Sequence, residues 1–127
     1  LLDRVGTEAR EAFAACVSAG GSADEVLRRI ARAFVAIGER FRFLEQYPAL
    51  RAERVSALAD EAEQPWSAWL AEAQARGELR QDMPVPVMRA LHRAMTFAIA
   101  DEIALGRVRS DEAGRLYGDV LVAALCA

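Results

Sequence analysis

Apolar side chains recur every three or four residues along almost the whole chain, and no stretch alternates apolar with polar residues at every second position. A period near 3.6 places side chains on one face of an α-helix, whereas a strand requires a period of two. The sequence therefore predicts an all-α fold. The clearest run lies between Ser22 and Pro48 and consists of Val26, Leu27, Ile30, Phe34, Ile37, Phe41 and Leu44.

Capping residues, glycines and prolines divide this pattern into a bundle of about five to six helices. Ser22 and Glu25 have the spacing of a capping box, in which the two residues satisfy each other's backbone N–H at a helix start. Pro65 lies inside the third apolar segment and predicts a kink or a break there, because proline removes a backbone hydrogen bond. Residues 77–84 form the one long expected loop. We expect helices over residues 1–17, 22–48, 48–75, 86–105 and 110–127.

The length of 127 residues and the hydrophobic content of 54% predict a single domain whose core needs neither disulfide nor metal. The net charge is −3, every cation is an arginine and no basic cluster occurs, which argues against direct binding of a nucleic-acid backbone by this chain. Cys16 and Cys126 lie near opposite ends without a motif around them, and we expect idle thiols in a reducing cytoplasm. No apolar run approaches the roughly 20 residues of a membrane span, and no signal-peptide pattern opens the chain.

The last predicted helix is apolar over more than half of its circumference, with only a narrow polar strip. One apolar face can pack on the chain's own core, and the remainder needs another partner. The preceding helix also carries a second apolar strip, so we expect a homodimer with two helices from each chain. Two glycines one turn apart either admit a helix of the second copy or simply fit inside the domain. The expected interface residues are Ala90, Phe97, Gly114, Gly118, Leu121, Val122 and Leu125.

Aromatic and methionine side chains converge on the space between the second, third and fourth predicted helices. Such a set forms either an ordinary core or an apolar ligand pocket with a few placed polar groups. The single histidine, His92, is either a core or interface residue with a hydrogen-bond partner or a ligand contact. The expected pocket residues are Phe34, Phe41, Trp66, Trp69, Met88, His92 and Met95.

Residue patterns that support catalysis are missing from the sequence. There is no Glu-x-x-His pair of the kind that binds two iron ions in helical bundles, and one histidine is too few for a carboxylate–histidine cluster. No glycine-rich phosphate loop follows a strand, and neither cysteine has a histidine at a suitable spacing. We therefore expect no enzyme activity, no cofactor and no metal site.

Three segments together make the chain resemble the C-terminal ligand-binding and dimerisation domain of TetR/AcrR-family transcriptional regulators. Residues 1–5 (LLDRV) are similar to the helix that joins the DNA-binding head to the sensor body in that family. The loop 77–82 (GELRQD), which follows a helix carrying residues 66–70 (WSAWL), is similar to the turn before the family's two dimerisation helices. Those two helices correspond to residues 87–105 and 111–127.

The resemblance covers essentially the whole chain and implies one sensor and dimerisation domain, residues 1–127, in a cytoplasmic bacterial protein. It implies a homodimer that binds a small apolar or amphipathic effector. In the whole regulator it implies a repressor that leaves its operator DNA when the effector binds. The family's N-terminal helix-turn-helix is absent from these residues, so operator DNA would be bound by a domain outside them.

Two other functions stay open at this point. The chain can be a stand-alone helical protein–protein interaction module, whose apolar last helix docks a different protein without any DNA binding. It can also be a helical-bundle enzyme, which a bound metal or cofactor would reveal. Self-association of the purified chain favours the regulator domain, whereas a stable monomer with an adhesive surface favours the interaction module.

Overall fold

The computed structural model describes residues 2–49, 52 and 61–127 of the chain. This part is all-α, as predicted, and contains no strand, only an isolated β-bridge between Leu79 and Cys126. A 3-10 helix, η1 (Arg42–Gln46), directly follows the second α-helix. The five α-helices in the described part are α1 (Leu2–Ser18), α2 (Ala23–Phe41), α4 (Gln64–Ala75), α5 (Val85–Ala104) and α6 (Ser110–Leu125).

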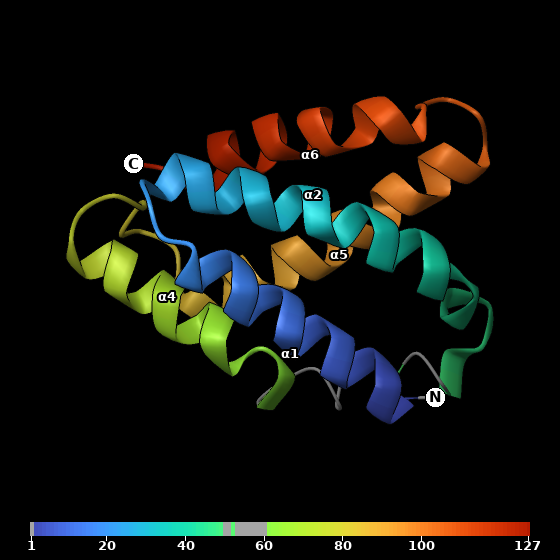
Figure 1. Cartoon of the computed structure of the whole chain (residues 1–127), viewed down its shortest axis with the longest axis horizontal. Helices are drawn as coiled ribbons and strands as arrows, with labels where there is room; N and C mark the ends of the chain where they lie inside the picture. The colour runs from blue at the N-terminus through green and yellow to red at the C-terminus, as the bar shows by residue number, and fades with distance from the viewer. Residues whose placement is uncertain (1, 50–51, 53–60) are drawn as a thin grey trace.

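Helix α2 is the centre of the bundle. It runs across the middle of Figure 1 with α6 on one side and α1 on the other, while α5 lies behind it and α4 lies beside α1. Apolar residues at every third or fourth position of α2 form the face that meets these neighbours, and side chains such as Val26, Leu27 and Ile30 are fully buried. The predicted periodicity of this segment therefore describes the core correctly.

Both ends of α2 follow the local sequence. The predicted capping box is confirmed: the N–H of Glu25 donates to Ser22 Oγ at 3.2 Å, and the N–H of Ser22 donates to Glu25 Oε1 at 3.2 Å. The α-helix stops at Phe41, short of its predicted end, and the chain continues as η1. Tyr47, directly before a proline, is extended, which is the conformation that proline imposes on its predecessor. Leu44 is nevertheless fully buried, as the apolar pattern predicts.

The third predicted helix, residues 48–75, is not one continuous helix in the structure. Its second half is α4, which begins at Gln64. Pro65 lies in the first turn of α4, where no backbone N–H is needed, so the predicted break at this proline is confirmed as a helix start. Residues 50–51 and 53–60 of the predicted helix lie outside the described residues.

The predicted loop after α4 is present and is fastened to the end of α6. Gly77 closes α4 with a φ of +77°, a left-handed conformation that favours glycine. The N–H of Arg80 then donates to the carbonyl oxygen of Leu125 at 2.9 Å, and the N–H of Ala127 donates to that of Glu78 at 3.2 Å. These bonds hold the end of the chain against the α4–α5 connection.

The core is filled by apolar side chains from all five α-helices. Where α2 crosses α5 the two helices come close at Gly38, because a Cβ there would lie 2.8 Å from the carbonyl oxygen of Thr96. Only glycine permits such an approach, so α2 and α5 are fixed against one another at this point. In the described part of the chain, no helix is both long enough and apolar enough to cross a membrane.

Candidate functional site

His92 lies where all five α-helices meet. Its side chain comes from α5 and is 1% exposed. One aromatic ring from each of the other four α-helices packs against the imidazole, with centroid distances between 4.6 and 6.0 Å. The imidazole therefore contacts all four of the other α-helices of the described part. The four rings are Phe13 of α1, Phe34 of α2, Trp66 of α4 and Tyr117 of α6.

The imidazole of His92 is neutral and has no hydrogen-bond partner in the described part of the chain. Burial, with the nearby charge of Arg93 as the smaller cause, lowers its pKa from 6.5 to about 3. A neutral imidazole has one N–H donor and one acceptor nitrogen, and neither Nδ1 nor Nε2 meets a described protein partner. Leaving a buried polar group unpaired costs about 1–3 kcal/mol. An unpaired group at this depth is a reason to look for a ligand.

The backbone of His92 is held by a pair of buried hydroxyl groups. The Tyr117 hydroxyl donates to the His92 carbonyl at 2.9 Å and lies 2.7 Å from Thr96 Oγ1. Because the single phenolic proton points to the carbonyl, the threonine hydroxyl donates to the tyrosine oxygen. Burial raises the pKa of Tyr117 well above its ordinary value, so the phenol stays protonated. These two bonds join α6 to α5 beside the imidazole.

A buried carboxylate, Glu63, lies at the start of α4 beside two arginines of α5. Glu63 is 1% exposed, and its Oε1 accepts from Arg93 Nη1 at 2.6 Å. Arg89 Nε lies 3.2 Å from the same oxygen without hydrogen-bond geometry, while Arg89 Nη1 donates to Ser67 Oγ at 2.9 Å. Two cations that are themselves largely buried thus offset the desolvation of one carboxylate.

A small cavity connects the imidazole with this charged cluster. It has room for about 20 Å³, the space of one water molecule. Side chains of α1, α2 and α5 form most of its wall, which is mainly apolar with a few polar groups, as in sites for small molecules. The lining residues are Val5, Ala9, Phe13, Phe34, Ile37, Glu63, His92, Arg93, Thr96 and Phe97.

The structure brings together four of the seven residues expected in a ligand pocket. Two of them line the cavity, namely Phe34 and His92. Two others form a stack behind the imidazole, with centroids 5.7 Å apart, namely Trp66 and Trp69. The remaining three contribute to the core or its edge without lining the cavity, because they lie on other parts of their helix faces: Phe41, Met88 and Met95.

Sequence reasoning assigned only two of the ten lining residues, Phe34 and His92, to a pocket. Phe13 shares the apolar spacing of the first helix, but local spacing does not show which helix it faces. Glu63 and Arg93 are 30 residues apart and look like ordinary surface charges in the sequence. The only local signal is that Arg89 and Arg93 share a helix face by their i,i+4 spacing. Phe97, which we expected at the dimer interface, is 9% exposed and is one of the residues that line the cavity.

The small residues of α6 face α2 of the same chain. A Cβ on Gly114 would lie 3.0 Å from Arg32 Cγ, and one on Gly118 would lie 3.4 Å from Arg28 Cγ. The close helix approach that the glycine pair predicts is therefore present within the domain. The apolar arc of α6 is wide because α2 and α5 both pack against it. Three more residues expected at the interface belong to this packing. Leu121 and Leu125 are fully buried, and Val122 is half-buried.

A second apolar surface lies on the outer faces of α5 and α6. At 100° per residue, exposed positions of α5 such as Val87, Ala94 and Ala98 fall on the face opposite His92. Four members of this surface are large apolar residues with 36–59% exposure. Of the residues expected at a dimer interface, Ala90 lies here. We call this surface the α5–α6 strip and define it as Val87, Ala90, Ala94, Ala98, Leu105, Leu116, Val120 and Ala123.

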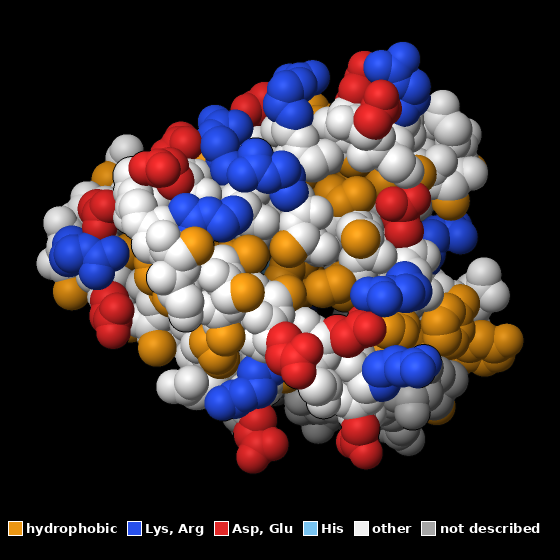
Figure 2. Space-filling view, in the orientation of Figure 1, with side chains coloured by type: hydrophobic (Ala, Val, Ile, Leu, Met, Phe, Trp, Pro, Cys, Tyr) orange, Lys and Arg blue, Asp and Glu red, His pale blue; other side chains and the backbone are white. Residues whose placement is uncertain are grey.

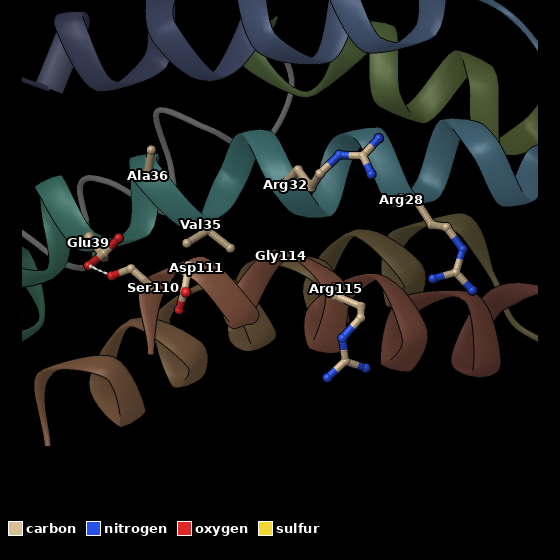
Figure 3. Close-up of a pocket in the computed structure, with 9 residues that line it drawn as sticks. All are labelled: Arg28, Arg32, Val35, Ala36, Glu39, Ser110, Asp111, Gly114 and Arg115. Carbon is tan, nitrogen blue, oxygen red and sulfur yellow. Dashed lines mark hydrogen bonds between the residues drawn. The ribbon is translucent and has the colours of Figure 1, made fainter. Parts of the chain in front are cut away.

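A wider groove, with room for about 500 Å³, runs along α2 and α6 and is open to solvent. Figure 3 shows Arg32 pointing away from α6 and Arg115 pointing away from α2, so these two cations do not converge. Ser110 Oγ donates to Glu39 Oε1 at 2.9 Å between the two helices. Acidic and basic side chains are interspersed over this face of the molecule (Figure 2). The groove therefore has the character of a solvated junction between two helices.

Metal-ligand clusters and thiols are two further features of the described part of the chain. No three His, Cys, Asp or Glu side chains gather there as a group that could hold a metal ion. Cys16 and Cys126 are free thiols, and burial raises the pKa of both. Comparison of the chain with known protein families, with curated proteins and with solved structures finds no match.

Proposed function

We propose that this chain is the effector-sensing and homodimerisation domain of a TetR-like transcriptional regulator. A helix-turn-helix domain outside these residues would bind operator DNA, and the effector would release it. The observation that carries the proposal is the neutral, unpaired His92 in a cavity where five helices meet. The sequence resemblance adds the regulatory context, because the two helices that correspond to the family's dimerisation helices are α5 and α6.

The small size of the cavity supports a sensing role. It has room for about one water molecule, so a ligand with several heavy atoms must displace side chains when it binds. Because the imidazole touches a ring from every other α-helix, that displacement changes packing throughout the bundle. A ligand that binds the displaced state better shifts the population towards that state, which is the linkage that a sensor needs.

The second part of the proposal is that another copy of this chain covers the α5–α6 strip. The strip exposes large apolar residues on both α5 and α6, and large exposed apolar surfaces often mark protein–protein contacts. The alanines of the strip permit close helix packing, and two copies related by a two-fold axis would form a four-helix interface. Arg115 and Asp119, paired at 3.2 Å on the exposed side of α6, would supply a polar rim.

A thermal-shift screen with small apolar and amphipathic compounds tests the sensing role. A ligand that binds the folded chain raises its Tm and changes the fluorescence of Trp66 and Trp69, which stand behind the imidazole. His92→Phe keeps an aromatic ring but removes both nitrogens, and its affinity for such a ligand is expected to fall at least about tenfold. Tyr47→Phe alters an exposed aromatic residue outside the cavity and serves as the control. Unchanged binding by His92→Phe would contradict the proposal.

Light scattering coupled to size-exclusion chromatography tests the dimer. We expect the chain to run as a dimer and Val120→Arg to shift it towards the monomer, because an unpaired charge in an interface is unfavourable. Tyr47→Arg, a change at a similarly exposed apolar residue outside the strip, should leave the dimer intact. A wild-type monomer at every concentration would instead favour a stand-alone interaction module, whose strip docks a different protein.

A further inference from the structure

We infer that the ligand of this cavity is a monocarboxylic acid with an apolar body, and that Arg93 binds its carboxylate. The inference deepens the proposed sensing role and rests on it. Its basis is the charge balance at one end of the cavity, the hydrogen-bond donors that line it and the apolar character of the remaining wall.

Among the described residues, the charged end of the cavity holds two cations, Arg89 and Arg93, and one carboxylate, Glu63. Arg89 and Arg93 approach Oε1 of Glu63 at 3.2 and 2.6 Å, and neither arginine has another acidic partner in the described part of the chain. The carboxylate is 1% exposed, and the two arginine side chains are largely buried. These three side chains place two guanidinium charges against one carboxylate, so an anion of single charge balances the excess.

Two donors reach the cavity from consecutive positions of α5. Arg93 lines it, and the charge of Arg93 acts on the interior, where it helps to keep the imidazole of His92 neutral. The neutral imidazole has one N–H, for which the described residues offer no acceptor. A carboxylate accepts hydrogen bonds on both oxygens and can pair with a guanidinium through two of them. The guanidinium and the imidazole N–H together match one carboxylate.

The remaining wall determines the body of the ligand. Phe13, Phe34, Ile37 and Phe97 line it, and burial of apolar groups against such side chains is favourable. A phosphomonoester carries about −1.5 to −2 charges at neutral pH, which exceeds the single charge that balances Arg89, Arg93 and Glu63. Gly38 fixes α2 against α5 at their crossing, so we expect the space for the ligand body to open on another side of the cavity, such as the wall formed by α1.

Binding of the acid exchanges one ion pair for another. The ligand carboxylate takes the Arg93 guanidinium, and Glu63 keeps Arg89, which already lies 3.2 Å from its Oε1. Neither carboxylate is then left buried without a cation, a strongly unfavourable state. Glu63 stands at the start of α4 and Arg93 belongs to α5, so the exchange removes a direct link between these helices. The carboxylate is thus the part of the ligand that changes the bundle.

Octanoate and 1-octanol are matched probes, since they share an apolar chain and differ in the charged group. Each is titrated into the whole chain and followed by calorimetry and by the fluorescence of Trp66 and Trp69. We expect octanoate to bind at least about tenfold tighter, the effect of a charge-assisted hydrogen bond. Arg93→Gln is expected to abolish this preference while 1-octanol still binds. Arg42→Gln removes an arginine that is paired with Asp101 at 2.7 Å outside the cavity, and should keep the preference.

The outcomes separate this inference from the sensing role. Equal affinities for the two probes would overturn the carboxylate inference and leave sensing in place. A preference for octanoate that survives in Arg93→Gln would place the carboxylate elsewhere and overturn it as well. Binding of neither probe would also overturn the inference, and the compound screen with His92→Phe then decides the sensing role separately.

Misfolding of Arg93→Gln would not remove the test. The comparison of the two probes on the unchanged chain needs no variant. Arg93→Lys keeps the positive charge but loses the planar fork of the guanidinium, so it is expected to keep part of the preference for octanoate. An Arg93→Lys chain with the full preference would contradict recognition by the paired guanidinium bonds.

Discussion

The two faces of α5 depart from the usual burial pattern in opposite ways, because one buries a polar residue and the other exposes apolar residues. The inner face buries His92, whose ring nitrogens have no partner among the described residues. The outer face exposes apolar residues such as Val87, Ala94 and Ala98. In most helices of globular proteins the apolar side chains are inside and the polar ones outside. Such departures occur at functional sites, so each face of this one helix indicates binding.

The difference between the faces limits what each can bind. The inner face offers an unpaired polar group beside a small, partly open and mainly apolar cavity, which suits a small molecule. The outer face offers no unpaired polar group but an apolar surface on two neighbouring helices, which suits another helical surface. Because α5 belongs to both, effector binding and dimer geometry act on the same helix in the proposed regulator.

The largest difference in stability is expected between two consecutive residues of α6, one on its buried face and one on its exposed face. Leu121 is fully buried, and Leu121→Ala is expected to lower the free energy of unfolding by about 2–5 kcal/mol, because burial is lost and a cavity is left. Val120 is 45% exposed, and Val120→Ala should change the free energy of unfolding of the monomer by less than about 0.5 kcal/mol. Urea titrations at protein concentrations where the chain is monomeric measure both. Equal losses would show that the strip is not a free surface.

The pH dependence of stability tests the inner face. The folded-state pKa of His92 is lowered from 6.5 to about 3, so between these values the unfolded chain binds a proton that the folded chain does not. As the pH falls below 6.5, this group therefore lowers the free energy of unfolding by up to about 1.4 kcal/mol per pH unit, and above 6.5 its contribution is constant. His92→Phe lacks this component and should lose less stability between pH 6.5 and 5. Equal slopes would contradict a neutral buried imidazole.

Removal of the hydrogen bonds that the Tyr117 hydroxyl makes between α6 and α5 should lower the free energy of unfolding by less than Leu121→Ala does. Tyr117→Phe leaves the His92 carbonyl and the Thr96 hydroxyl without their buried partner. The expected loss in the free energy of unfolding is about 1–3 kcal/mol. Tyr47→Phe removes an exposed hydroxyl and is the matched control, which should unfold at the wild-type urea concentration. A Tyr117→Phe chain as stable as this control would show that the hydroxyl pair does not hold the two helices together.

The smallest effect, of opposite sign, is expected from His92→Phe at pH 7.5. The change removes two unpaired ring nitrogens from the core, and the cavity beside them has room for the slightly larger ring. We expect a gain of about 1 kcal/mol in the free energy of unfolding. A residue that lowers stability but supports ligand binding is typical of functional sites. A clear loss of stability, measured by urea unfolding without ligand, would show that the imidazole is a structural part of the core.

Local spacing is enough to predict where several helices of the described part start and stop, because the forces involved act within a few residues. It did not predict that α2 ends at Phe41. Ser22 and Glu25 form a capping box at the start of α2, and Pro65 lies in the first turn of α4, where its missing N–H costs no hydrogen bond. Gly77 adopts the left-handed conformation that ends α4. The same spacing places Phe34 in the core, since an apolar residue on an apolar helix face is buried by whichever helix covers that face.

Which helix covers which face is a property of the packed bundle. The apolar arc of α6 predicts two neighbours, but only the packing shows that α2 of the same chain meets Gly114 and Gly118. Glu63 and Arg93 are 30 residues apart, and their ion pair exists because α4 and α5 lie side by side. A helix fixes the direction of a side chain, but His92 is buried by rings from the four other described α-helices. That burial is the main cause of its lowered pKa.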